Sequence, residues 1–305
     1  MTTIRRRAAR LRDRLVEQLS RQMIDALDER LGSRVNTRPP VHDRLDDLDR
    51  LGRRALAGVG LDHTDPGFRG RPEDLAAHTA ALLNWAGGAD GPAAHRGLWF
   101  NPPVAVEHLP GGVGILLVNE RIVEQPFAFA HLARLPRGAR VLDVGGAEST
   151  VGLSLAALGL DVTVVDPREH PLRHPNLRHE RRRLDELAPA APFDAALALS
   201  SIEHFGLEGY DNTRADPRLD VAALRNLREL VVPDGLLVLT VPFGARSVDA
   251  FQRVYDEDGL DELLAGWQTI ERVTAGRLDR TTWQAGAASH EGHGVALVAA
   301  RNTKA

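Results

Sequence analysis

One stretch near the middle of the chain constrains the fold more than any other. The run at 141–144 is apolar except for Asp143, and it passes directly into Gly145, Gly146 and Ala147 before a helix pattern begins. Small residues between a strand and a helix let a ligand approach the backbone, where the first N–H groups of the helix can bind it. About 20 residues later, Asp166 ends the next apolar run, where a carboxylate can accept hydrogen bonds from both hydroxyls of a ribose. The pattern therefore predicts a nucleoside-binding site.

The rest of the second half alternates between short strand-like and helix-like patterns. Strands are expected at 140–144, 161–166, 193–199 and 235–241. Helices are expected at 119–132, between the glycine turn and 157, at 220–230 and at 248–265. Such alternation indicates βαβ units and a parallel sheet. Two more strand-like runs, 268–273 and 294–300, follow without a helix between them. We therefore expect an α/β fold with a doubly wound, mostly parallel sheet and an antiparallel C-terminal strand pair.

The first third of the chain has a different, helical character. Leucines and a methionine recur four residues apart within 4–31, which predicts an amphipathic helix that could act as a lid or a homodimer contact, or pack as an ordinary surface helix. A second helix is expected at 73–85, and the glycine- and proline-rich segment 87–114 is expected to be loop-like. The predicted organisation is a helical N-terminal extension over 1–115 and a Rossmann-like domain over 116–305.

Composition excludes several classes of function. The chain has no cysteine, which rules out disulfides, thiolate metal sites and thiol nucleophiles. The net charge of -4 argues against a general nucleic-acid surface, and no apolar run approaches the roughly 20 residues that span a bilayer. His290, Glu291 and His293 lack the spacing of a helical metal motif. We expect a cytoplasmic protein without a metal, acting on a small molecule.

Three ordered motifs resemble those of one enzyme superfamily. They are Asp143-Val144-Gly145-Gly146-Ala147, Pro192-Phe193-Asp194-Ala195-Ala196 and Val232-Pro233-Asp234-Gly235-Leu236-Leu237-Val238. Together they resemble the class I S-adenosylmethionine-dependent methyltransferases, although Ala147, Ser149 and Asp234 stand where that family often has glycine. The turn does not follow the G-x-G-x-x-G spacing of dinucleotide enzymes. The segments 119–126 and 200–206 further resemble bacterial methyltransferases found among polysaccharide and secondary-metabolite enzymes.

The resemblance implies S-adenosylmethionine as the cofactor and assigns residues to its parts. Arg121 is a candidate for binding its carboxylate and Glu124 its ammonium group, although the two can equally form an i, i+3 ion pair on a solvated helix. Adenine is expected beside Pro167, Arg168 and Leu184, with Asp185 near the exocyclic amine. The full predicted set is Arg121, Glu124, Asp143, Gly145, Gly146, Ala147, Asp166, Pro167, Arg168, Leu184, Asp185 and Ser200.

Candidate catalytic residues follow the strand expected at 193–199, at the sheet edge where ligands bind in doubly wound folds. His204 could deprotonate a hydroxyl near neutral pH, and Glu203 could orient the imidazole or bind substrate. Alternatively, His204 caps a helix or satisfies a buried backbone group. Tyr210 and Arg214, in a polar loop, are candidates for binding the acceptor, or for contacts with solvent alone.

These observations favour methyl transfer from S-adenosylmethionine to a small-molecule acceptor, above all to an oxygen of a sugar or a secondary metabolite. Transfer from an activated carbon depends mainly on aligning the nucleophile, the methyl group and the sulfur. N-methylation is the near alternative, and a non-catalytic, nucleoside-binding regulatory protein is a second. The glycine spacing disfavours a nicotinamide-dependent dehydrogenase.

Overall fold

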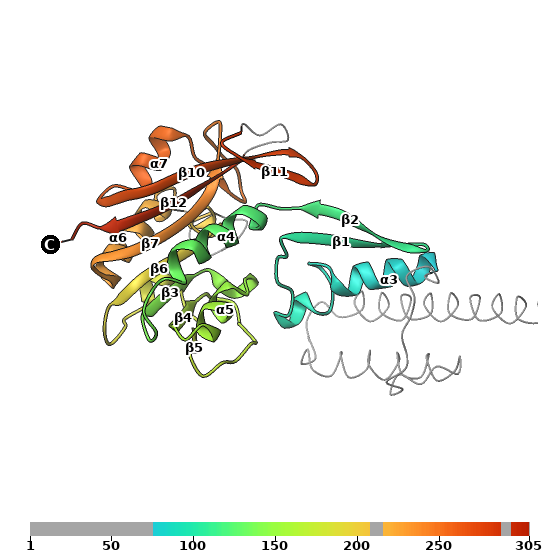
Figure 1. The fold of residues 1–305 in the computed structure, drawn as a ribbon, viewed down its shortest axis with the longest axis horizontal. Coiled ribbons are helices and arrows are strands. Elements are labelled where there is room, and N and C mark those ends of the chain that lie inside the picture. The colour runs from blue at the N-terminus through green and yellow to red at the C-terminus, as the bar shows by residue number, and fades with distance from the viewer. Residues whose placement is uncertain (1–75, 208–215, 288–293, 305) are drawn as a thin grey trace, which may run out of the picture. The chain divides into compact units, whose positions relative to one another are not determined.

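The computed structural model describes residues 76–207, 216–287 and 294–304 (Figure 1). Of these, 76–99 and 106–114 belong to one compact unit, and 100–105 and 115–304 belong to a second. Within the described residues, no helix is long and apolar enough to cross a membrane. The amphipathic helix expected at 4–31, the candidate acceptor residues Tyr210 and Arg214, and the histidines at 290 and 293 lie outside the described residues.

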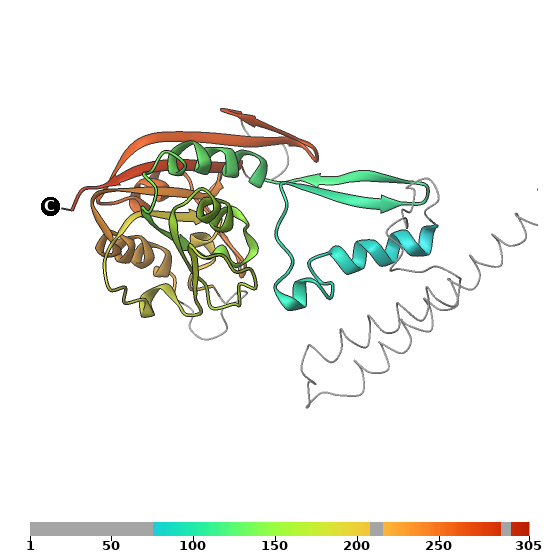
Figure 2. The same cartoon turned by 60° about the horizontal axis from the view of Figure 1, so that its bottom comes forward.

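The segment expected to be loop-like holds a β-hairpin, so that prediction was wrong. Helix α3 (Ala77–Gly87) falls where a helix was expected, and after a short 3-10 helix, η2 (Ala94–Arg96), the chain forms β1 (Val104–Leu109) and β2 (Gly112–Val118). The two strands lie along each other as a separate two-stranded sheet (Figure 2). Gly111, with φ of 75°, supplies the left-handed conformation that the tight turn between them requires. The many glycines hid a strand pattern that is apolar at alternate positions.

The second unit is built on an eight-stranded sheet in the order β11-β10-β12-β7-β6-β3-β4-β5. Its parallel part comprises β3 (Arg140–Val144), β4 (Asp161–Val165), β5 (Leu177–Glu180), β6 (Phe193–Leu199) and the long strand β7 (Val231–Phe243). Strand β3 pairs with β4 on one side and β6 on the other, so the strand order reverses at β3. The doubly wound, mostly parallel sheet that the sequence predicted is confirmed.

Helices cover both faces of this sheet, and each face has its own apolar core. On one face, α4 (Arg121–Leu132) and α5 (Val151–Ala157) pack on alternate residues of the central strands. On the other, α6 (Leu219–Leu230) and α7 (Glu257–Leu263) do the same. Leu142 belongs to the core beneath α6 and α7, and Val141 belongs to the core beneath α4 and α5, as the alternation of side chains along a strand requires.

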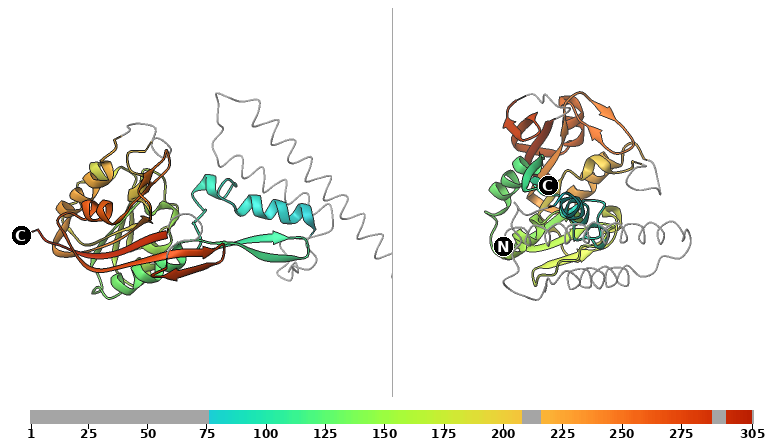
Figure 3. Two further views of the ribbon diagram at one scale, coloured as in Figure 1. Left: turned by 90° about the horizontal axis from the view of Figure 1, so that it is seen from above. Right: turned by 90° about the vertical axis from the view of Figure 1, so that its right-hand side faces the viewer.

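The C-terminal strand pair forms as expected, with additions. Strands β10 (Trp267–Asp279) and β12 (Gly294–Asn302) are antiparallel to each other, and β12 is antiparallel to β7 (Figure 3). The chain also forms β11 (Thr282–Ala285), which pairs with β10. The helix expected at 248–265 was wrong in its first half. That half forms a small ribbon of β8 (Ser247–Val248) and β9 (Arg253–Val254), and Asp256 caps α7 by accepting the Gly259 N–H at 2.8 Å.

A tight turn within β7 explains the resemblance motif at 232–238. Val231 pairs with Phe193 and Leu236 with Ala195, so the four residues between are looped out of the pairing with β6. Asp234 has φ of 60°, a left-handed conformation that glycine adopts most easily and that aspartate tolerates better than most residues. The aspartate thus stands in a position whose backbone favours glycine.

Replacing Asp234 tests this backbone requirement. We expect Asp234→Ala to lower the free energy of unfolding by about 1 kcal/mol, because alanine is disfavoured at positive φ. Asp234→Gly is the matched control, because both variants lose the exposed contact with Arg301 at 3.9 Å while glycine relaxes the backbone. Urea denaturation measures both, and an equal loss in the two variants would contradict the conformational explanation.

Candidate active site

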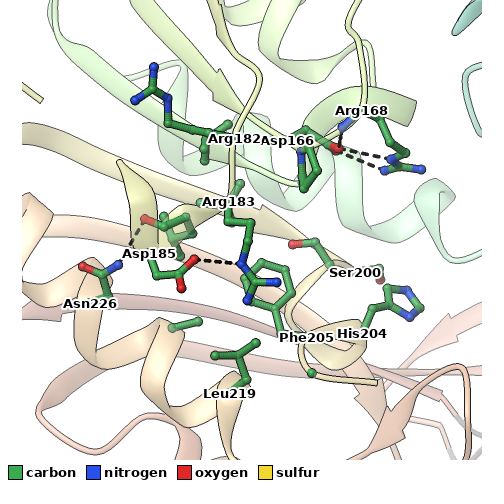
Figure 4. Close-up of a pocket in the computed structure, with 18 of the residues that line it drawn as sticks. Asp166, Arg168, Arg182, Arg183, Asp185, Ser200, His204, Phe205, Leu219 and Asn226 are labelled. Carbon is green, nitrogen blue, oxygen red and sulfur yellow. Dashed lines mark hydrogen bonds and ion pairs between the residues drawn. The ribbon is translucent and has the colours of Figure 1, made fainter. Parts of the chain in front are cut away.

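A pocket opens at the carboxyl ends of the parallel strands, beside the point where the strand order reverses (Figure 4). Gly145 follows β3, Asp166 follows β4 and Ser200 follows β6, so the fold brings three distant segments to one edge. Among the predicted cofactor and catalytic residues, those lining the pocket are Arg121, Gly145, Asp166, Pro167, Arg168, Leu184, Asp185, Ser200 and His204. The predicted residues that do not line it are Asp143, Gly146, Ala147, Glu124 and Glu203.

The glycine turn is shaped by close packing. Gly145 has φ of 72°, and a Cβ there would lie 2.6 Å from the Cβ of Ser201. A Cβ on Gly146 would lie 2.5 Å from a carboxylate oxygen of Asp143. Both glycines are therefore required by the approach of neighbouring side chains, and the turn continues into the short 3-10 helix η3 (Gly146–Glu148). The small residues therefore let the turn pack closely against the neighbouring side chains.

Asp143 lies buried beneath this turn. Its side chain is 2% exposed, and its Oδ2 has no hydrogen-bond partner among the described residues. Burial, together with the nearby charge of Asp166, raises the pKa of Asp143 to about 7. The carboxylate lies against Gly146 and does not line the pocket.

Asp166 is the carboxylate that the turn and the next loop hold at the pocket. It accepts a hydrogen bond from the Ala147 N–H at 3.1 Å and from the Arg168 N–H at 2.9 Å. The Arg168 guanidinium also donates to both of its oxygens, at 3.1 and 3.0 Å, and reaches on to Glu148 (Figure 4). The carboxylate that was predicted to bind ribose is thus already paired with an arginine that is itself partly exposed.

Arg121 reaches the pocket from the first turn of α4, where Glu124 holds it. The guanidinium donates to Glu124 at 2.6 Å, and Glu124 also accepts hydrogen bonds from the hydroxyls of Ser200 at 2.5 Å and Thr240 at 2.7 Å. Glu124 is fully buried, so the ion pair does not sit on a solvated helix. Burial is the largest single effect on the pKa of Arg121 and would lower it, but the charges of Glu124, Glu120 and Glu203 and the hydrogen bond to Glu124 together raise the pKa above its ordinary value. The cation is therefore kept charged and fixed in direction.

The opposite side of the pocket is formed by α6 and by the short 3-10 helix η4 (Leu184–Glu186). Asp185 is paired with Arg183 at 3.1 Å, and Asn226 donates to the Leu184 carbonyl at 3.2 Å (Figure 4). Sequence reasoning missed the α6 residues that line this side, which are Leu219, Ala222, Ala223 and Asn226. Their spacing of three, four and seven residues marks one helix face, and that signal was present in the sequence.

His204 ends the short 3-10 helix η5 (Ile202–His204), which follows Ser200 at the end of β6. Its Nδ1 lies 2.7 Å from the Phe251 carbonyl oxygen, which can only accept, so Nδ1 carries the proton and Nε2 is the nitrogen able to accept one. Burial lowers the pKa of His204 below its ordinary value, so the imidazole is neutral at pH 7. This arrangement of the imidazole suits a general base that accepts a proton on Nε2.

Glu203 lies behind His204 and does not line the pocket. Its Oε1 is 3.7 Å from His204 Nε2, beyond hydrogen-bonding distance, and burial raises its pKa well above the ordinary value. The Phe251 carbonyl, which carries no mark in the sequence, orients the imidazole through Nδ1. Ser200 has φ of 40°, a strained conformation that the Thr240 carbonyl stabilises by accepting the Ser200 N–H at 3.1 Å.

Comparisons with known proteins bear on this pocket. A sequence model described as a methyltransferase domain matches residues 120–287, which is more than half of the chain. The chain belongs to this methyltransferase family. It is an S-adenosylmethionine-dependent methyltransferase of class I, as the three sequence motifs indicated. No curated protein matches the sequence.

Several solved structures are also similar to this methyltransferase. The 1,6-didemethyltoxoflavin-N1-methyltransferase of Burkholderia thailandensis is 23% identical over 60% of this chain and 77% of its own, with a TM-score of 0.46. The N-methyltransferase NodS of Bradyrhizobium japonicum is 17% identical over 61% of this chain and 88% of its own, with a TM-score of 0.45. TehB of Haemophilus influenzae is 16% identical over 63% and 73%, with a TM-score of 0.40.

The raised pKa of Asp143 predicts a component of stability that depends on pH. Its carboxyl ionises near 3.8 in the unfolded chain and near 7 in the fold, so the fold holds the proton more tightly between these values. Stability from this group is therefore present below about pH 4 and is lost as the pH rises towards about 7. We expect Asp143→Asn to unfold at a higher temperature than the wild type at pH 8, with the difference shrinking towards pH 4.

Thermal unfolding across this pH range checks the prediction, with Asp90→Asn as the control because Asp90 is exposed. A difference between Asp143→Asn and the wild type that does not change with pH would show that the Asp143 carboxyl does not titrate in this range.

Proposed function

We propose that this methyltransferase transfers the methyl group of S-adenosylmethionine to a hydroxyl oxygen of a small molecule, a sugar or a secondary metabolite. The observation that carries the proposal is the neutral imidazole of His204 at the pocket, with its proton on Nδ1 and Nε2 able to accept another. A hydroxyl nucleophile must lose its proton during the transfer, and a base of this kind takes it.

The pocket's donor set fits the cofactor. Asp166 would accept the ribose hydroxyls, with Arg168 giving way, and Arg121 would bind the carboxylate of the methionine part. Leu184 and the small side chains of Ala222 and Ala223 leave an apolar slot for adenine, whose exocyclic amine would meet Asp185. Glu124 does not reach the pocket, so we assign it to holding Arg121 and not to binding the ammonium group.

The proposed reaction transfers one methyl group and releases one proton. When bound, S-adenosylmethionine would supply an activated methyl carbon, and the electron pair of its bond to sulfur would stay on sulfur as the acceptor oxygen forms the new bond. His204 takes the hydroxyl proton on Nε2 and later releases it to solvent. Its other proton stays on Nδ1, which donates it to the Phe251 carbonyl throughout, so the imidazolium that forms is stabilised by a carbonyl dipole.

Cofactor binding is tested first by calorimetric titration with S-adenosylhomocysteine. We expect saturable binding by the wild type and at least tenfold weaker binding by Asp166→Ala, because the ribose hydroxyls then lose their acceptor. A nicotinamide dinucleotide serves as the ligand control, and Asp161→Ala serves as the matched variant, an aspartate at the start of the same strand and outside the pocket. Equal affinity of Asp166→Ala and the wild type would contradict the assignment of Asp166.

The base is tested with a panel of hydroxyl and amine acceptors and a labelled methyl group. We expect hydroxyl methylation by the wild type, and a drop of about 100-fold in His204→Ala with the affinity for S-adenosylhomocysteine unchanged. The wild-type rate should stay level near pH 7 and fall below the lowered pKa of His204, where the imidazole is protonated.

The exposed residue His95 provides the control variant, His95→Ala. Labelling of amines alone, or an undiminished rate in His204→Ala, would contradict the proposal of O-methylation with His204 as the base. Binding of the cofactor with no product from any acceptor would favour a non-catalytic role.

A further inference from the structure

The ribbon formed by β8 and β9 contains a turn built by one carboxylate. Asp249 Oδ1 accepts hydrogen bonds from the backbone N–H groups of Phe251 and Gln252, both at 2.7 Å. The Asp249 N–H in turn donates to the Gln252 carbonyl at 3.1 Å. An aspartate that binds the two N–H groups following it closes a turn and holds it in one conformation. The four residues 249–252 are thus rigidly shaped.

One carbonyl group of this turn, that of Phe251, points at His204. The Phe251 carbonyl oxygen accepts the Nδ1 proton of His204 at 2.7 Å, over a sequence distance of 47 residues. The phenyl ring of Phe251 also lies against the imidazole, with ring centroids 4.7 Å apart and planes at 60°. The carbonyl decides which nitrogen is protonated, whereas the ring only packs.

The ribbon and His204 are tied together from behind by Arg253. This arginine is 4% exposed, and its Nη1 donates to the carbonyls of Glu203 at 3.2 Å and Phe205 at 2.6 Å, the two residues that flank His204. Arg253 is also the second residue after Phe251, at the start of β9. The backbone on both sides of the His204 contact is therefore held by the same buried guanidinium.

We propose that Asp249 is a positioning residue of this methyltransferase, whose turn aims the Phe251 carbonyl at His204 and so fixes the protonated nitrogen as Nδ1. The inference rests on the proposed function in one respect, that His204 Nε2 receives the acceptor's proton. Asp249 does not line the pocket, so we place its effect on the reaction at His204.

Other charged groups around His204 are distinct from the turn. Arg168 and Arg121 lower its pKa and Glu148 raises it, after the larger effects of burial and of the Phe251 carbonyl. Glu203, on the same 3-10 helix, faces Nε2 at 3.7 Å. The Asp249 carboxylate accepts from the Phe251 and Gln252 N–H groups, so we expect a change at Asp249 to reach His204 through the carbonyl.

The test compares three variants by nuclear magnetic resonance of protein labelled with ¹⁵N-histidine. Correlations between ring nitrogens and ring protons identify which nitrogen is protonated, and the His204 signals are assigned by their loss in His204→Ala. We expect the Nδ1-protonated form in the wild type. We expect Asp249→Ala to lose it in favour of the Nε2-protonated form, because the turn loses both N–H contacts.

Two matched variants separate positioning from general stability. Asp249→Asn keeps a side-chain oxygen that can accept from the two N–H groups, so it should retain the wild-type protonation. If the negative charge of Asp249 were responsible instead, Asp249→Asn would behave like Asp249→Ala. Phe251→Ala keeps the backbone carbonyl, removes the ring and should also retain it. Unchanged protonation in Asp249→Ala, or an equal change in Phe251→Ala, overturns the inference.

This spectroscopic result needs no acceptor, so it is independent of the proposed function. If His204→Ala methylates hydroxyls as fast as the wild type, the proposed function fails while the protonation of His204 still reports on Asp249. Where an acceptor is found, Asp249→Ala should lower kcat by about tenfold, with the KM for the methyl donor unchanged and activity restored in Asp249→Asn.

Discussion

The whole site depends on the pairing of β3 with a parallel strand on each side. Because β4 and β6 flank β3 in the same direction, the segments after all three strands end at one edge of the sheet. Each segment supplies a different chemical group to this edge of the sheet. These groups are the backbone of the turn at Gly145, the carboxylate of Asp166 and the hydroxyl of Ser200. A sheet with any other order would scatter them.

Burial of acidic groups behind the pocket is the second organising feature. Glu124 lies at the junction of α4, β7 and the end of β6, where it receives hydrogen bonds from a residue of each. Such a carboxylate is tolerated only because its partners satisfy it, and removing one partner leaves a charge that water cannot reach. The network joins the helix that carries Arg121 to the strands that carry the reactive edge.

The parts of the fold that the sequence predicted are those written in local patterns. Strands β3, β4 and β6 are mostly apolar runs, and the glycine turn follows β3 and Asp166 follows β4 at recognisable spacing. Several of the strands that escaped prediction are short or polar, whereas β1 and β2 were hidden by the glycines around them. β5 reads Leu-Arg-His-Glu, and β8 and β9 have two residues each, so their pairing with distant neighbours decides their conformation.

The same distinction applies to the site. Asp166, Arg121 and His204 were found because their side chains carry the chemistry. The orienting partner of His204 is a backbone carbonyl, which every residue possesses, so no sequence pattern could single out Phe251. Glu124 was correctly paired with Arg121 but was expected to bind a ligand, because its complete burial follows from packing between segments far apart in the chain.

Two ion pairs in the pocket involve the carboxylates to which we assign the nucleoside. Asp166 is paired with Arg168 and Asp185 with Arg183, so the proposed ribose and adenine contacts compete with these internal partners. Both arginine side chains are partly exposed, at 40% and 26%, and such ion pairs weaken as ionic strength rises. Hydrogen bonds from an uncharged ribose or adenine do not weaken in the same way. Dissolved salt therefore shifts the competition at these two carboxylates towards the nucleoside.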